Sequence, residues 1–110
     1  MRALAVFTTV ATEADAQRLA RTLVERRLVA CAQISRIESF YRWDGAIQNE
    51  REYRLLLKTT EARREALTTA LRELHPYELP AIHAIPLEHV EPRYAEWIEA
   101  NVASDDGTAP

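Results

Sequence analysis

Cysteine and glycine are scarce in this chain of 110 residues, which contains one cysteine and two glycines. A single thiol cannot form a disulfide within the chain, and it cannot supply the several thiolates of a zinc or iron–sulfur site. Loops that bind nucleotide phosphates are rich in glycine, so having only Gly45 and Gly107 argues against such a loop. The sequence also has no serine-centred nucleophile elbow.

An excess of basic residues and long apolar runs are missing as well. The chain has 14 Lys and Arg against 17 Asp and Glu, a net charge of −3, whereas nucleic-acid-binding proteins usually show a basic excess. No apolar run approaches the ~20 residues of a membrane span. The apolar start is broken by Thr8 and Thr9, unlike a signal peptide. We therefore expect no nucleic-acid or membrane partner and a cytoplasmic location.

Apolar periodicity predicts two strand–helix–strand units followed by one more helix. The expected elements are a strand at 3–10, a helix at about 13–26, strands at 28–43 and 46–58, a helix that ends near His75, a strand at 81–87 and a helix that begins at Pro92. This order is the α+β, ferredoxin-like βαββαβ arrangement with an added C-terminal helix. We expect one domain over 1–102 and a flexible tail over 103–110.

Local signals place the helix ends. Thr12 is a typical N-cap, with Asp15 three residues later as in a capping box. Thr59 or Thr60 is expected to cap the second helix, which must end near His75 because a proline follows.

The two central strands are long and are joined by Asp44-Gly45, which fits a tight hairpin turn. A strand of about 14 residues spans roughly 45 Å, whereas a compact chain of this length has a diameter of roughly 35 Å. The hairpin should therefore extend beyond its own domain. Because exposed strand edges pair readily with other chains, we predict a closed homo-oligomer in which each hairpin lies on a neighbouring subunit.

The apolar positions of the first long strand change parity along its length. Ala30, Ala32 and Ile34 share one face, but Ile37, Tyr41 and Trp43 share the other. A bulge near Ser35-Arg36 would restore the facing, and we predict one there.

Cys31 and His75 are the first candidates for chemistry. Cys31 has no fixed histidine partner in the sequence, and we interpret it as a small core residue, since free cysteine is usually buried. His75 stands at a helix C-terminus, where an imidazolium would cap the last carbonyls or an imidazole would bind a metal with ligands from elsewhere. His83 and His89 lack metal-ligand spacing, so we interpret them as structural or surface residues.

Aromatic residues are a second group of candidates, for which core and interface packing is the simpler interpretation. The alternative is a pocket wall, with Lys58, Glu52 or Glu78 as its polar groups. The aromatic residues concerned are Tyr41, Trp43, Tyr77, Tyr94 and Trp97.

Several stretches, taken in order, resemble the CutA family of divalent-cation tolerance proteins. The resemblance runs from about residue 4 to residue 102, and the stretches that carry it are Leu28-Val29-Ala30-Cys31-Ala32, Ser39-Phe40-Tyr41-Arg42-Trp43-Asp44-Gly45-Ala46-Ile47, Lys58-Thr59-Thr60, His75-Pro76-Tyr77-Glu78-Leu79-Pro80 and Tyr94-Ala95-Glu96-Trp97-Ile98. It implies a ferredoxin-like subunit in a tight homotrimer, similar to the PII signalling trimers. It also implies a role in metal-ion response, with copper binding attributed to some members.

Two departures from the family pattern bear on the metal. Members that bind copper typically have a cysteine in the first strand and two adjacent histidines before Pro-Tyr, where this chain has Thr8 and Leu74-His75. Thiolate is the soft ligand that favours Cu(I), so its loss argues against copper binding in that mode. The segment 33–39 is also one residue shorter than in many members and lacks their Pro-Gly.

Three functions follow from these observations. The first is a non-enzymatic homotrimeric binding protein of the metal-response type, which takes copper or another divalent cation at His75 and has ligand clefts between subunits. The expected cleft residues are Tyr41, Trp43, Lys58, Tyr77, Glu78 and Trp97. The second is a PII-like signalling or adaptor trimer that binds a small anionic ligand through Lys58, or a protein partner. The third is a hydrolase using Cys31 or His75, which would need a positioned base that the sequence does not reveal.

Overall fold

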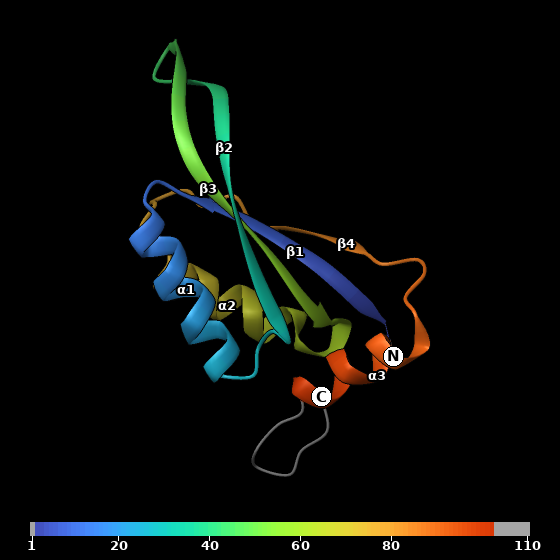
Figure 1. The fold of residues 1–110 in the computed structure, drawn as a ribbon. Coiled ribbons are helices and arrows are strands. Elements are labelled where there is room, and N and C mark those ends of the chain that lie inside the picture. The colour runs from blue at the N-terminus through green and yellow to red at the C-terminus, as the bar shows by residue number, and fades with distance from the viewer. Residues whose placement is uncertain (1, 103–110) are drawn as a thin grey trace.

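A computed structural model of the chain describes residues 2–102 as a four-stranded antiparallel sheet with two helices on one face (Figure 1). The strands lie in the order β2-β3-β1-β4, which confirms the predicted α+β fold. The elements are β1 (Ala3–Val10), α1 (Glu13–Glu25), β2 (Cys31–Trp43), β3 (Ala46–Thr60), a 3-10 turn (Glu61–Arg63), α2 (Arg64–Leu74), β4 (His83–Pro86) and α3 (Pro92–Asn101). The tail predicted over 103–110 lies outside the described residues.

The two helices that cover the sheet bury the faces that their apolar spacing predicts. Together with alternate residues of β1 and β3, they form the main core. Its largest fully buried members are Val6, Val10, Leu19, Leu23, Val29, Leu55, Leu57, Leu67 and Leu71. A smaller core joins α3 to Ala3 and Ala30, at one end of the opposite face of the sheet. No helix of residues 2–102 is long and apolar enough to cross a membrane.

The helix ends agree with the sequence in one case and differ in another. Thr12 Oγ1 accepts a 3.1 Å hydrogen bond from the N–H of Asp15, which confirms the predicted cap of α1. The predicted cap of α2 is wrong, because the 3-10 turn separates β3 from this helix. Thr60 precedes that turn without capping it through its side chain, and Thr59 Oγ1 donates instead to the carbonyl of Leu28 at 2.7 Å.

The β2–β3 hairpin projects past the two helices (Figure 1) and makes the molecule elongated, with extents of 47 × 28 × 20 Å. Its turn has φ of 53° at Asp44 and 76° at Gly45, and positive φ at both positions is typical of a two-residue type I′ turn. The predicted overhang is therefore present, and Phe40 near the tip is 72% exposed.

The predicted bulge near Ser35-Arg36 is absent. Each residue of β2 faces one residue of β3 without interruption, from Cys31 opposite Lys58 to Trp43 opposite Ala46. The parity change needs no bulge, because the hairpin leaves the helices at this point. Side chains beyond it no longer have to face the main core, so apolar residues occur on both faces of the strand there, with Phe40 on one face and Ile37, Tyr41 and Trp43 on the other.

The last two elements match their predicted positions. β4 is shorter than the expected 81–87 and forms an edge of the sheet, a position that tolerates Pro86, which has no N–H to donate. Pro92 stands in the first turn of α3, and the side chain of Glu91 caps this helix by accepting from the N–H of Tyr94 at 3.1 Å.

Candidate functional site

The structure divides the seven expected site residues into two groups, one beside Glu52 and one beside Lys58, two residues of β3 that lie roughly 20 Å apart along the strand. Tyr41, Trp43, Tyr77 and Glu78 line a cleft of about 540 Å³ between the outer half of the hairpin and the loop after α2. We call this the hairpin cleft. His75 lies behind its loop wall, whereas Lys58 and Trp97 lie near α3.

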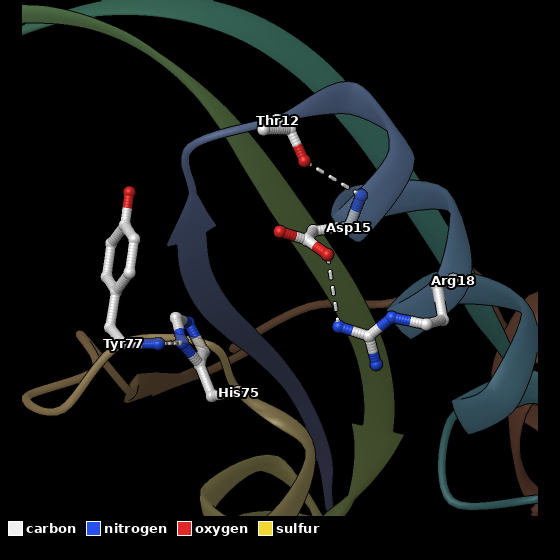
Figure 2. A network of polar contacts seen from close by, with 5 residues as sticks. All are labelled: Thr12, Asp15, Arg18, His75 and Tyr77. Carbon is white, nitrogen blue, oxygen red and sulfur yellow. Dashed lines mark hydrogen bonds and ion pairs between the residues drawn. The ribbon is translucent and has the colours of Figure 1, made fainter.

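His75 is buried, with 8% of its surface exposed, and both ring nitrogens have partners. Nδ1 accepts from the backbone N–H of Tyr77 at 3.1 Å (Figure 2), and Nε2 lies 3.0 Å from Oγ1 of Thr8 in β1. Because Nδ1 accepts, the proton of the neutral ring is on Nε2, which donates to Thr8. The side chain thus fastens the loop after α2 to the first strand.

Burial is the main reason that the pKa of His75 is lower than usual. The backbone of Thr9 and the carboxylate of Asp15 oppose this shift, and Arg18 adds to it. Asp15 and Arg18 form a 3.3 Å ion pair at the start of α1 (Figure 2). The imidazolium cap suggested by the sequence is therefore wrong, since the ring is neutral at pH 7 and bonds Tyr77 and Thr8 instead.

The arrangement around His75 does not by itself make a metal centre. Within residues 2–102, no three His, Cys, Asp or Glu residues come together in a way that could hold a metal ion. A metal at His75 would have to replace one of its two hydrogen bonds and take further ligands from another subunit.

Two carboxylates from β3 enter the hairpin cleft beside its aromatic walls. Tyr77 Oη donates a 2.7 Å hydrogen bond to Oε2 of Glu52, and Tyr41 Oη donates to Glu50. Burial, followed by the bond to Glu52, raises the pKa of Tyr77 well above its usual value. The bond to Glu50 likewise raises the pKa of Tyr41. Both phenols are therefore protonated donors at neutral pH.

The sequence does not single out Glu50 as a cleft residue, and it indicates Glu52 only as one possible polar group. The signal that would have found them is the Asp44-Gly45 turn. A two-residue turn fixes the register, which sets Glu50 opposite Ser39 and Glu52 opposite Ile37. Both carboxylates then share a face with the ring of Tyr41.

The second group surrounds Lys58, on the face of the sheet away from α1 and α2. Lys58 Nζ donates to Gln33 Oε1 at 3.2 Å and lies 5.4 Å from the centre of the Tyr94 ring. Tyr94 in turn stacks on Trp97, with ring centres 5.6 Å apart. This group presents one ammonium beside two aromatic rings.

Cys31 lies directly opposite Lys58 in the sheet and is partly exposed, so its assignment to the core is wrong. Its Sγ lies 3.7 Å from the hydroxyl of Tyr94. The register explains this position, because Cys31 is on the face that α3 covers only at one end.

Comparison with known proteins agrees with the fold and the motifs. The family model of the CutA1 divalent ion tolerance protein matches residues 4–101. The chain belongs to the CutA1 family. The divalent-cation tolerance protein CutA of Thermotoga maritima is 39% identical over 97 residues, which cover 88% of this chain and 96% of that protein.

Solved structures of CutA1 family members superpose closely on this fold. CutA from Synechococcus elongatus PCC7942 has a TM-score of 0.90 at 38% identity, covering 92% of this chain and 90% of that one. A protein from Archaeoglobus fulgidus, described as a periplasmic divalent cation tolerance protein, has a TM-score of 0.88 at 30% identity, covering 91% and 98%. CutA1 proteins are named for ion tolerance and not for an enzymatic activity, in agreement with the expectation that this chain is not an enzyme.

Proposed function

We propose that this chain is a homotrimeric binding protein that takes part in the response to metal ions, with ligand sites at clefts between its subunits. The observation that carries the proposal is the hairpin, which extends past the rest of the fold with its apolar side chains uncovered in the single chain. Near its tip Phe40 is 72% and Trp43 is 55% exposed. Apolar groups on a projecting, paired hairpin are typical of a surface that packs on another copy.

The uncovered face of the sheet supports the same assembly. The rings of Phe7 and His83 stack on it with centres 5.3 Å apart, and Ile85 of the edge strand β4 is half exposed. A sheet face with aromatic and branched side chains is stable only when another layer covers it. Three copies, as in the PII signalling trimers that the family resembles, would cover these faces together.

His75 is the residue that we propose for the metal, with copper or another divalent cation as the ion. Its low pKa supports this role, because a metal binds the neutral imidazole and competes with no proton at pH 7. The oxygen of Thr8 and groups from a neighbouring subunit would complete the coordination. One of the two hydrogen bonds of the His75 ring must then break, so that a ring nitrogen becomes free to bind the metal.

A second candidate function is the binding of a small anion in the manner of a signalling trimer. The observation that favours it is Lys58, whose ammonium lies beside Tyr94 at the end of the sheet face that α3 covers, with Trp97 stacked on Tyr94. An intersubunit cleft there would offer a cation and two stacking rings to an anionic ligand. We place the protein in the cytoplasm as part of this proposal, since the one cysteine gives no sign of an oxidising compartment.

The test is native mass spectrometry of the full chain, alone and with stoichiometric Cu(II), Cu(I) or Zn(II). We expect trimers that take up metal in multiples of three, and no uptake after His75→Ala. His83→Ala is the matched control and should leave uptake unchanged. Monomers at micromolar concentration would refute the assembly, and metal uptake that survives His75→Ala would refute the site.

A further inference from the structure

The hairpin cleft carries more negative charge than the aromatic walls alone would suggest. Three carboxylates line it, from Glu50, Glu52 and Glu78, and the described residues of its lining include no Lys, Arg or His. Three aromatic rings share the same lining, from Tyr41, Trp43 and Tyr77. Aromatic faces and carboxylates both attract cations, so the cleft is the wrong environment for the anion considered above and the right one for a positive ligand.

Glu52 is the most buried of the three carboxylates. The residue is only 8% exposed and lines the cleft, and its Oε2 accepts a hydrogen bond from the hydroxyl of Tyr77. Among residues 2–102, no hydrogen bond reaches Oε1 and no ion pair joins Glu52 to a basic side chain. Oε1 is not among the buried side-chain atoms that lack a partner, so it is open to the cleft and can accept a hydrogen bond from a ligand there. A positive group bound in the cleft would pair with it.

The geometry argues for an organic cation and against a bare metal ion. The carboxylates of the cleft are too widely spread to act together, because no three potential ligands within residues 2–102 converge on one point. The cleft also measures about 540 Å³, many times the volume of a single ion. Phenol and indole rings bind organic cations through their faces and hold methylene groups by apolar contact.

We propose that the hairpin cleft binds a linear aliphatic polyamine. Glu50 and Glu52 are alternate residues of β3, so their side chains leave one face of the strand roughly 6.7 Å apart. This separation is comparable with the spacing of neighbouring amines in such a molecule. Two ammonium groups pair with these carboxylates, the methylene chain lies against Tyr41 and Trp43, and Glu78 faces a third amine from the loop. The assignment rests on the proposed function, because it names the ligand of one of its clefts.

The experiment is a titration of the full chain with spermidine. Binding is monitored by the fluorescence of Trp43 in a Trp97→Phe variant, in which Trp43 is the one remaining tryptophan. We expect saturable binding that is at least tenfold weaker in Glu52→Gln and in Glu50→Gln. The second variant protects the test, because Glu50 is exposed and its replacement does not threaten folding. Glu99→Gln on α3 is the matched control and should bind as the parent does. Mg²⁺ at equal concentration and ionic strength should not displace spermidine.

Four results would overturn the proposal. The first three are the absence of saturable binding, equal affinity in the parent and both cleft variants, and displacement by equimolar Mg²⁺, which would reveal nonspecific attraction. Dissociation of the oligomer in Glu50→Gln without any response to spermidine would also overturn it, because the carboxylates would then hold a second copy of the chain. If spermidine fails while trimers still take up copper through His75, only the polyamine is refuted. If spermidine binds as expected to a chain that is monomeric and metal-free, only the proposed function is refuted.

Discussion

Tyr77 and Glu52 are 25 positions apart in the chain, and a 2.7 Å hydrogen bond from the phenol to the carboxylate joins the loop after α2 to the projecting hairpin. Both residues line the hairpin cleft, so this bond joins two of its walls. Its removal should lower both the stability of the chain and the affinity of the cleft for a ligand.

Replacing Tyr77 by Phe should lower the free energy of unfolding by about 1–3 kcal/mol, because a buried carboxylate loses its donor. Urea denaturation at fixed protein concentration measures this change. Tyr94→Phe is the matched control, since the hydroxyl of Tyr94 has only a 3.7 Å contact to a thiol. Equal losses in the two variants would show that the bond to Glu52 contributes nothing specific.

The burial of His75 predicts a pH dependence of stability. Its pKa is lower in the folded chain than the usual 6.5, so the unfolded chain binds more protons in the interval below that value. Stability should therefore fall as the pH decreases from 7.5 through 6.5 toward the folded-state pKa. In His75→Gln this part of the loss should vanish, whereas His83→Gln should keep it. Urea unfolding at a series of pH values makes the comparison, and parallel curves for parent and His75→Gln would contradict it.

Thr8→Val should destabilise the chain by about 1–3 kcal/mol, because it leaves the Nε2–H of buried His75 without an acceptor. Thr8→Ser keeps the hydroxyl and should restore most of the loss. Thermal unfolding of the three proteins at pH 7.5 provides the measurement. If valine and serine behave alike, the hydrogen bond is not what Thr8 provides.

Gly45→Ala should cost about 1 kcal/mol, since an alanine at φ of 76° is strained while nothing lies within 4 Å of the added carbon. Gly45→Asn should cost less, because asparagine tolerates this conformation better. Denaturant midpoints of the two variants at equal m-value test the order. A larger loss for asparagine would mean that the turn does not have the type I′ conformation.

Phe40→Asp should weaken self-association without unfolding the single chain, because Phe40 is largely exposed within it. Val24→Asp, on the outer side of α1, replaces another exposed apolar residue and should leave the assembly intact. Sedimentation velocity over a dilution series distinguishes the two. An unchanged sedimentation coefficient for Phe40→Asp would show that the hairpin tip lies outside the interface.

The sequence predicted the elements that depend on local patterns. The strand at 3–10, the Thr12 cap and the Asp44-Gly45 turn agree with the structure, because each is determined by neighbouring residues. The bulge and the cap of α2 failed for a tertiary reason. A strand that leaves its helices no longer needs one apolar face, and Thr59 is used by the carbonyl of Leu28 instead of a helix.

The candidate site was harder to predict, because its parts come from distant segments. His75 and Tyr77 stand out through the Pro-Tyr motif, but their contacts with Thr8 and Glu52 depend on how β1 and β3 are placed beside the loop. Residue type and the family resemblance group Lys58 and Trp97 with the hairpin. Their separation from it depends on the packing of α3 on the sheet, which sets Tyr94 and Trp97 beside Lys58 at the other end of β3.

Because β2 pairs with β3 without interruption, the length of the hairpin and the faces of its side chains are linked. Removing two residues from each strand would shorten it by roughly 7 Å and leave every remaining side chain on its present side. Removing one residue from each would instead turn the outer part over, so that Phe40 and Tyr41 exchanged faces. Two homologous subunits with hairpins of different length can therefore present the same side chains on the same face only when each strand differs in length by an even number of residues.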